Sequence, residues 1–75
     1  MTDPRGAAAD RLEEIAAELD LAAQHCRVAA QHYRERNVPR AAAHAWAAQG
    51  HVHHGTTALF QLAEEHATRS VPSTE

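Results

Sequence analysis

The stretch Asn37-Val38-Pro39 interrupts two long runs of helix-favouring residues, and it decides the fold. Asn tolerates the left-handed backbone conformation that closes a helix, and Pro fits the first position of the next helix, where its missing N–H has no helical partner. A residue that precedes proline is pushed away from helical dihedral angles, so the sequence predicts a turn at residues 37–38. We therefore expect an all-α chain whose two helices fold back on each other as an antiparallel hairpin.

The composition favours an all-helical class and argues against several kinds of partner. Of the 75 residues, 18 are Ala, the best helix former. The net charge of -3, with His counted as neutral, gives no general reason to bind nucleic acid or an anionic membrane. No apolar run approaches the length of a membrane span, and residues 1–10 lack the apolar core of a signal peptide. We expect a cytoplasmic protein without a membrane partner.

The first helix is predicted over residues 10–36. Asp10 and Glu13 have the spacing of a capping box, in which two side chains satisfy free N–H groups at a helix start. An earlier start capped by Asp3 is the alternative, and Gly6 weakens it. We therefore expect residues 1–9 to form a flexible lead-in.

Apolar residues in this first helix recur at alternating steps of three and four. This is the heptad pattern of a helix that packs against another helix. The positions are Leu12, Ile15, Leu19, Ala22, Cys26, Ala29 and Tyr33.

The second helix is predicted over residues 39–69, followed by a disordered tail at 70–75 that has no periodicity. Gly50 and Gly55 lie inside it, and each costs about 1 kcal/mol relative to Ala. Either the helix breaks between these glycines or a neighbouring backbone approaches closely there; we expect one continuous helix. Its apolar positions are Ala45, Ala48, Val52, Leu59 and Leu62, with Trp46, Phe60 and Ala63 beside them.

A single hairpin of this composition buries little apolar surface, because mostly Ala residues face each other near the turn. Two hairpins that pair into a four-helix bundle would cover the remaining apolar side chains. We therefore expect a homodimer. The predicted oligomer interface consists of Leu12, Ile15, Leu19, Cys26, Tyr33, Trp46, Val52, Leu59, Phe60 and Leu62.

The charges are unevenly distributed along the chain. Residues 1–20 carry six acidic residues and two Arg, whereas the corner near the turn is basic through Arg27, Arg34, Arg36 and Arg40. An antiparallel dimer, with the corner of one hairpin beside the termini of the other, would bring opposite charges together. Two other interpretations of the basic corner are solvated helix surface, which suits any single Arg best, and a nucleic-acid site.

Four histidines occupy equivalent positions on the two helices. His25 and His51 are equally far from Val38 along the chain, and so are His32 and His44. Folding at Val38 therefore predicts two histidine pairs along one edge of the hairpin, about 10 Å apart because they are one heptad apart at 1.5 Å per residue.

The histidines allow three interpretations. The plainest is that they are half-buried interface residues that stack and hydrogen-bond. A second is a metal site for zinc, copper or nickel, in which His54 joins His25 and His51 as a three-nitrogen set. A third is a pH switch, because protonation of facing histidines near their usual pKa of about 6.5 places like charges together.

The remaining candidate chemistry gives no support for an enzyme. The single cysteine, Cys26, cannot form an internal disulfide, and its apolar position suits the core and a reducing compartment. Asp10 and His66 are equally far from Val38 and are expected to pair across the open end. We expect a non-enzymatic, homo-oligomeric protein that acts through protein association as an accessory or adaptor; the alternative is a metal-binding or pH-sensing bundle.

Overall fold

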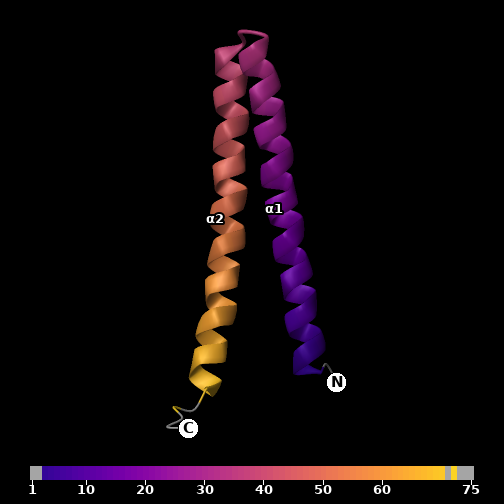
Figure 1. Cartoon of the computed structure of the whole chain (residues 1–75), viewed down its shortest axis with the longest axis vertical. Helices are drawn as coiled ribbons and strands as arrows, with labels where there is room; N and C mark the ends of the chain where they lie inside the picture. Colours follow the sequence, from indigo (N-terminus) through magenta and orange to yellow (C-terminus); the bar gives the residue numbers. More distant parts are fainter. Residues whose placement is uncertain (1–2, 71, 73–75) are drawn as a thin grey trace.

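The computed structural model describes residues 3–70 and Pro72, and these form two long helices that fold back on each other (Figure 1). Helix α1 spans Pro4–Arg34 and helix α2 spans Val38–Arg69. The hairpin measures 57 × 31 × 16 Å. Figure 1 shows the helices side by side near the turn and further apart toward the termini. The predicted all-α antiparallel hairpin is confirmed.

Helix α1 begins six residues earlier than predicted. Asp3 is its N-cap, since the carboxylate accepts a hydrogen bond of 3.2 Å from the N–H of Arg5, and Pro4 follows in the first turn. An Asp cap stabilises a helix by about 1 kcal/mol, which offsets the similar cost of Gly6. The prediction of a flexible lead-in is therefore wrong for residues 4–9. Residues 1 and 2 lie outside the described part of the chain.

The C-terminus of α1 closes in a Schellman motif, in which the last helical carbonyls are satisfied by N–H groups from beyond the helix. The N–H of Arg36 donates to the carbonyl of Tyr33 at 3.0 Å, and the N–H of Asn37 donates to the carbonyl of His32 at 2.8 Å. This motif requires a left-handed residue at its centre, and Arg36 adopts that conformation with φ of 61°. The expectation that Asn37 takes it is wrong.

Asn37 instead starts the second helix. Its side chain accepts a hydrogen bond of 3.4 Å from the N–H of Arg40, so it is the N-cap of α2. One residue thus ends the motif that closes α1 and caps the next helix. The turn consequently occupies residues 35–37 rather than 37–38, and α1 ends two residues earlier than predicted.

Replacing Arg36 with Gly is expected to raise the free energy of unfolding by about 1 kcal/mol. The left-handed conformation costs an L-residue roughly 1–2 kcal/mol, and Gly avoids this cost while losing part of the gain through its more flexible unfolded state. Urea denaturation at fixed protein concentration measures the difference. Arg36→Ala is the matched control, since it removes the charge and keeps Cβ. Equal gains from both variants would mean that charge, and not backbone strain, sets the effect.

The contact between the helices is built mainly from methyl-sized side chains. Ala22 and Ala29 of α1 are buried, as are Ala41 and Ala48 of α2, and Ile15 is the one larger apolar side chain that is buried in the described residues. Alanines near the turn permit close approach of the two backbones. Toward the open end, where Ile15 and the half-buried Leu62 lie, the helices diverge (Figure 1).

Helix α2 runs without interruption through both of its glycines. Gly55 is buried, and a Cβ built there would stand 3.1 Å from Cδ2 of Leu19, so the close neighbour is a side chain of α1. Gly50 has open space at the same position. A side chain at position 55 would thus press on Leu19, whereas one at position 50 would meet no neighbour. Helix α2 ends at Arg69 as predicted; of the predicted tail, residues 71 and 73–75 lie outside the described residues.

Neither described helix combines the length and apolar character that crossing a membrane would require.

Candidate functional site

The hairpin has two faces of opposite character, and these follow from the positions that pack between the helices. In α1 the buried residues are Ile15, Ala22 and Ala29, spaced by seven. The residues three positions after these are polar: Glu18, His25 and His32. The residues four positions after them are more apolar: Leu19, Cys26 and Tyr33. Steps of three and four lead to opposite sides of a helical stripe. The contact stripe is therefore flanked by one polar and one apolar face.

The predicted heptad pattern is consequently half correct. Ile15, Ala22 and Ala29 do contact the second helix, but the companion positions Leu12, Leu19, Cys26 and Tyr33 are exposed. Glu18, His25 and His32 occupy the other half of the contact. Glu18 and His25 each have a hydrogen-bond partner on the second helix, and His32 stacks on His44.

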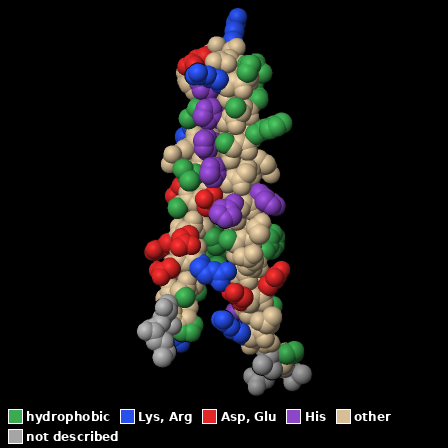
Figure 2. Space-filling model, turned by 180° about the vertical axis from the view of Figure 1, so that it is seen from behind, with side chains coloured by type: hydrophobic (Ala, Val, Ile, Leu, Met, Phe, Trp, Pro, Cys, Tyr) green, Lys and Arg blue, Asp and Glu red, His purple; other side chains and the backbone are tan. Residues whose placement is uncertain are grey.

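Four histidines form a single row in the groove between the helices, which we call the histidine column (Figure 2). From the middle of the hairpin toward the turn, its members alternate between the helices as His51, His25, His44 and His32. The ring centroids of successive pairs are 5.3, 5.3 and 5.4 Å apart, and the outer two pairs are stacked with interplanar angles of 12° and 18°.

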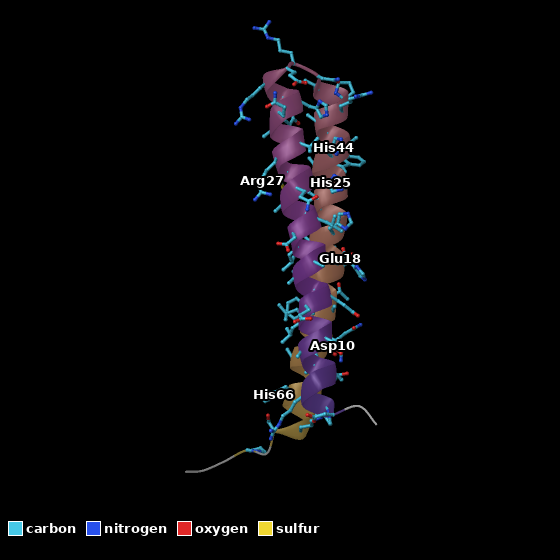
Figure 3. The ribbon with its side chains drawn as sticks, turned by 90° about the vertical axis from the view of Figure 1, so that its right-hand side faces the viewer. Asp10, Glu18, His25, Arg27, His44 and His66 are labelled. Carbon is cyan, nitrogen blue, oxygen red and sulfur yellow. The ribbon has the colours of Figure 1, made fainter. Side chains whose placement is uncertain are left out.

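The column includes both predicted pairs and joins them. His25 stacks on His51 and His32 stacks on His44, as expected from their distances to Val38. His25 and His44 also contact each other, through Nδ1 atoms 3.0 Å apart (Figure 3). The two helices interdigitate, so histidines that are one heptad apart on one helix are bridged by a histidine of the other.

The central contact of the column sets a condition on protonation. When two ring nitrogens share a hydrogen bond, one carries a proton and donates it while the other accepts through its lone pair. His25 and His44 must therefore differ in the protonation of Nδ1. Toward the turn, the buried Nδ1 of His32 has no hydrogen-bond partner among the described residues, and Oε2 of Glu35 lies 3.7 Å from it.

A carboxylate closes the other end of the column. Oε2 of Glu18 accepts a hydrogen bond of 2.8 Å from Nδ1 of His51 and lies 3.4 Å from Nδ1 of His54. The hydrogen bond from His51 lowers the pKa of Glu18 below its usual value of 4.5. Because the folded-state pKa is depressed, this contact stabilises the fold above pH 4.5, and its contribution is lost as the pH falls through the lowered value.

Glu18 was not among the predicted site residues, although the sequence carries a signal for it. It lies seven residues before His25 and fourteen before His32, so it occupies the same heptad position. Extending the histidine spacing by one step toward the N-terminus would have found it.

The predicted three-nitrogen metal set is not brought together. His51 and His54 both turn toward Glu18, while Nδ1 of His25 is directed at His44. The side chain of His54 is 73% exposed, at the edge of the groove. Among the described residues, no group of three or more His, Cys, Asp or Glu side chains is arranged to hold a metal ion.

On the opposite side of the hairpin lies a surface that we call the apolar face. A shallow groove there is lined by Cys26, Ala29, Ala30 and Tyr33 of α1 and Ala45, Ala48, Gln49 and Val52 of α2. Heptad spacing extends the surface toward the open end through Leu12, Leu19 and Leu59, which are 37–48% exposed. Five of the larger apolar side chains are thus on this surface: Leu12, Leu19, Tyr33, Val52 and Leu59.

The other predicted interface residues divide between core and outer surface. Ile15 is buried between the two helices, and Leu62 is half-buried near the open end. Trp46 and Phe60 are 82% and 69% exposed, and they lie two heptads apart on α2. They form an outer stripe beside the apolar face.

The predicted basic corner is fully on the surface. Arg27, Arg34, Arg36 and Arg40 are all exposed. Figure 3 shows Arg27 pointing away from the side that carries His25, His44 and Glu18. The corner is therefore free to face another molecule.

A single ion pair joins the two helices near the open end of the described chain. Arg11 of α1 contacts Glu65 of α2 at 2.6 Å. The expected pairing of Asp10 with His66 is not formed between these two described side chains (Figure 3).

Comparisons with known proteins do not identify a relative: no protein-family model matches the chain, nor does a curated protein or a solved structure.

Proposed function

We propose that this chain acts through protein association, with two copies packing their apolar faces together into a four-helix bundle. The observation that carries the proposal is an inversion of the usual burial pattern. The hairpin buries four alanines and Ile15, while Leu12, Leu19 and Tyr33 remain 37–53% exposed. A contiguous exposed apolar surface on a small chain is typical of an interaction site.

The size of the hairpin favours a second copy as the occupant of this face. A chain of 75 residues has little core of its own, and this one forms a two-helix layer only 16 Å thick. A second hairpin supplies another layer with the same apolar composition, and a two-fold axis makes one surface complementary to itself. Association therefore completes the core that a single hairpin lacks.

Charge favours an antiparallel arrangement of the two hairpins. The exposed Arg34, Arg36 and Arg40 lie at the turn, whereas Asp10, Glu13 and Glu14 lie near the N-terminus. Placing the turn of one copy beside the termini of the other brings these opposite charges together. Such exposed pairs contribute less than about 1 kcal/mol each, so they select the orientation while the apolar face supplies the affinity.

Cysteine cross-linking tests association and orientation together. In an antiparallel dimer whose two-fold axis crosses the middle of the helices, residues about 16 positions from the turn face their own copies. Val52 lies 15 residues after Asn37, so a Val52→Cys, Cys26→Ala variant is expected to form a disulfide-linked dimer on mild oxidation.

The natural cysteine provides the control. Two copies of Cys26 would lie about 16 Å apart along the same bundle, from 1.5 Å per residue, which exceeds the roughly 7 Å between Cα atoms that a disulfide tolerates. Wild type is therefore expected to remain uncross-linked. Cross-linking through Cys26, or none through position 52, would contradict the antiparallel arrangement.

We infer an accessory or adaptor role, without catalysis, for the assembled bundle. The stripe of Trp46 and Phe60 lies to the outer side of the proposed dimer contact and remains available for another protein. Aromatic side chains are enriched at the centres of protein interfaces. The thiol of Cys26 on the apolar face suits a reducing compartment such as the cytoplasm, where it stays unoxidised.

A further inference from the structure

We infer that the histidine column is an acid-sensitive latch that holds α1 against α2 at neutral pH and releases it when the imidazoles become protonated. The inference goes beyond association, and it does not depend on it, because the column lies between the two helices of one chain. It rests on ring contacts and on the charges around them.

The first step is the contact at the centre of the column. A protonated imidazole carries N–H on both ring nitrogens. If His25 and His44 were both protonated, two N–H groups would point at each other across 3.0 Å, with no lone pair to accept either. The folded column therefore excludes the doubly protonated state of this pair, whereas the unfolded chain does not.

Few of the described carboxylates lie next to the histidine column. At the His51 end, Glu18 of α1 accepts a hydrogen bond and also faces His54 of α2. At the turn end, Glu35 lies 3.7 Å from His32. No such carboxylate contact is made by His25 or His44 in the described part of the chain. Added positive charge is thus compensated at the ends and uncompensated in the middle.

The change in the folding equilibrium constant follows from how many protonated states the contact excludes. At pH 5.5, one unit below the usual imidazole pKa of about 6.5, each free histidine is about 90% protonated. Excluding only the doubly protonated His25–His44 state lowers the folding equilibrium constant about sixfold relative to pH 8.0, by proton linkage.

Proton linkage also gives the direction of the stability change with pH and the pH range in which it occurs. Stability should therefore fall as the pH drops through the usual imidazole range near 6.5, where two free imidazoles take up protons that the His25–His44 contact excludes. The Glu18 contact persists across this range, because its loss occurs only below pH 4.5, where the carboxylate takes up a proton. The two effects are therefore separated on the pH axis.

Urea titrations followed by far-UV circular dichroism at pH 8.0 and pH 5.5 test the latch. All samples contain EDTA at one fixed protein concentration, so trace metal does not contribute. Wild type is expected to lose about sixfold in its folding equilibrium constant at the lower pH. His44→Phe and, separately, His25→Phe keep a ring in the column and remove the facing nitrogens. Either variant is expected to shrink this loss by about sixfold.

His53→Phe is the matched control, since His53 is exposed and takes no part in the column contacts. It should retain the wild-type pH dependence. Using two variants on different helices keeps the test valid if one of them does not fold. Wild type that is equally stable at both pH values overturns the latch, as does a pH dependence that all three variants share. The readout is helicity, so it is interpretable even if light scattering finds a single chain and the dimer proposal fails.

Discussion

Replacing Val52 with Asp is expected to convert the associated bundle into single chains. Val52 lines the groove of the apolar face, and the proposed dimer buries it near the two-fold axis, where two introduced carboxylates would face each other without a cationic partner. An unpaired buried carboxylate costs several kcal/mol, so the dissociation constant should rise by at least about a hundredfold. Size-exclusion chromatography with light scattering measures the mass across a concentration series.

The same substitution at Val28 is the control. Val28 is 39% exposed and Val52 is 36% exposed, so the two valines are equally accessible in the single hairpin. Val28 stands three residues after His25 and four before His32, which places it toward the polar side of α1. Val28→Asp should leave the mass unchanged. An equal loss of association in both variants would mean that the apolar face is not the interface.

Replacing Ala41 with Leu is expected to lower the free energy of unfolding by about 1–3 kcal/mol, the usual cost of overpacking a close contact. Ala41 is 0% exposed and lies beside the turn, where the two helices are closest. Three added carbon atoms have no space there unless the helices separate. Separation would also disturb the ring contacts of the histidine column. Urea denaturation at fixed concentration measures the loss.

Ala43→Leu serves as the matched control two residues further along. Ala43 is exposed, and Ala and Leu have similar helix propensities, so this change should be close to neutral. If Ala41→Leu were also neutral, close packing of methyl groups would not be what determines the spacing of the helices.

The fold could be predicted from the sequence because it depends on local signals. Asn37 and Pro39 mark a turn whatever surrounds them, and Ala-rich runs favour helices on either side. The detail of the turn was not predictable in the same way. Arg36 adopts a left-handed conformation that its side chain disfavours, because the hydrogen bonds that close α1 require it at that position. Residue preference favoured Asn37, and hydrogen bonding decided otherwise.

The candidate site was harder to predict, because the heptad pattern has two flanks. The positions of Leu19 and Cys26 are as regularly spaced as those of Glu18 and His25, and the two sets flank the same buried stripe of α1. Hydrophobicity selects the first set. In the structure the second set lines the polar groove between the helices, through ring stacking and the hydrogen bond between Glu18 and His51, while Leu19 lies against Gly55 and stays partly exposed. The spacing of residues alone does not show whether these polar contacts or the burial of leucine side chains stabilises the hairpin more.

We propose different tasks for the two faces of the hairpin. The polar contact would hold the helices of one chain in register, and the apolar face would bind a second copy. Because the apolar face is built from both helices, opening the histidine column would also dismantle the proposed dimer contact. Association and acid sensitivity are then properties of opposite sides of the same contact stripe.

Sedimentation equilibrium of the wild-type chain at micromolar concentration and pH 8.0 shows whether the hairpin needs a second copy. We expect a helical particle of twice the 8.2 kDa chain mass, which dissociates and loses helicity together on dilution. A fully helical particle of 8.2 kDa that keeps its helicity on dilution would contradict it, because the apolar face would then need no second copy.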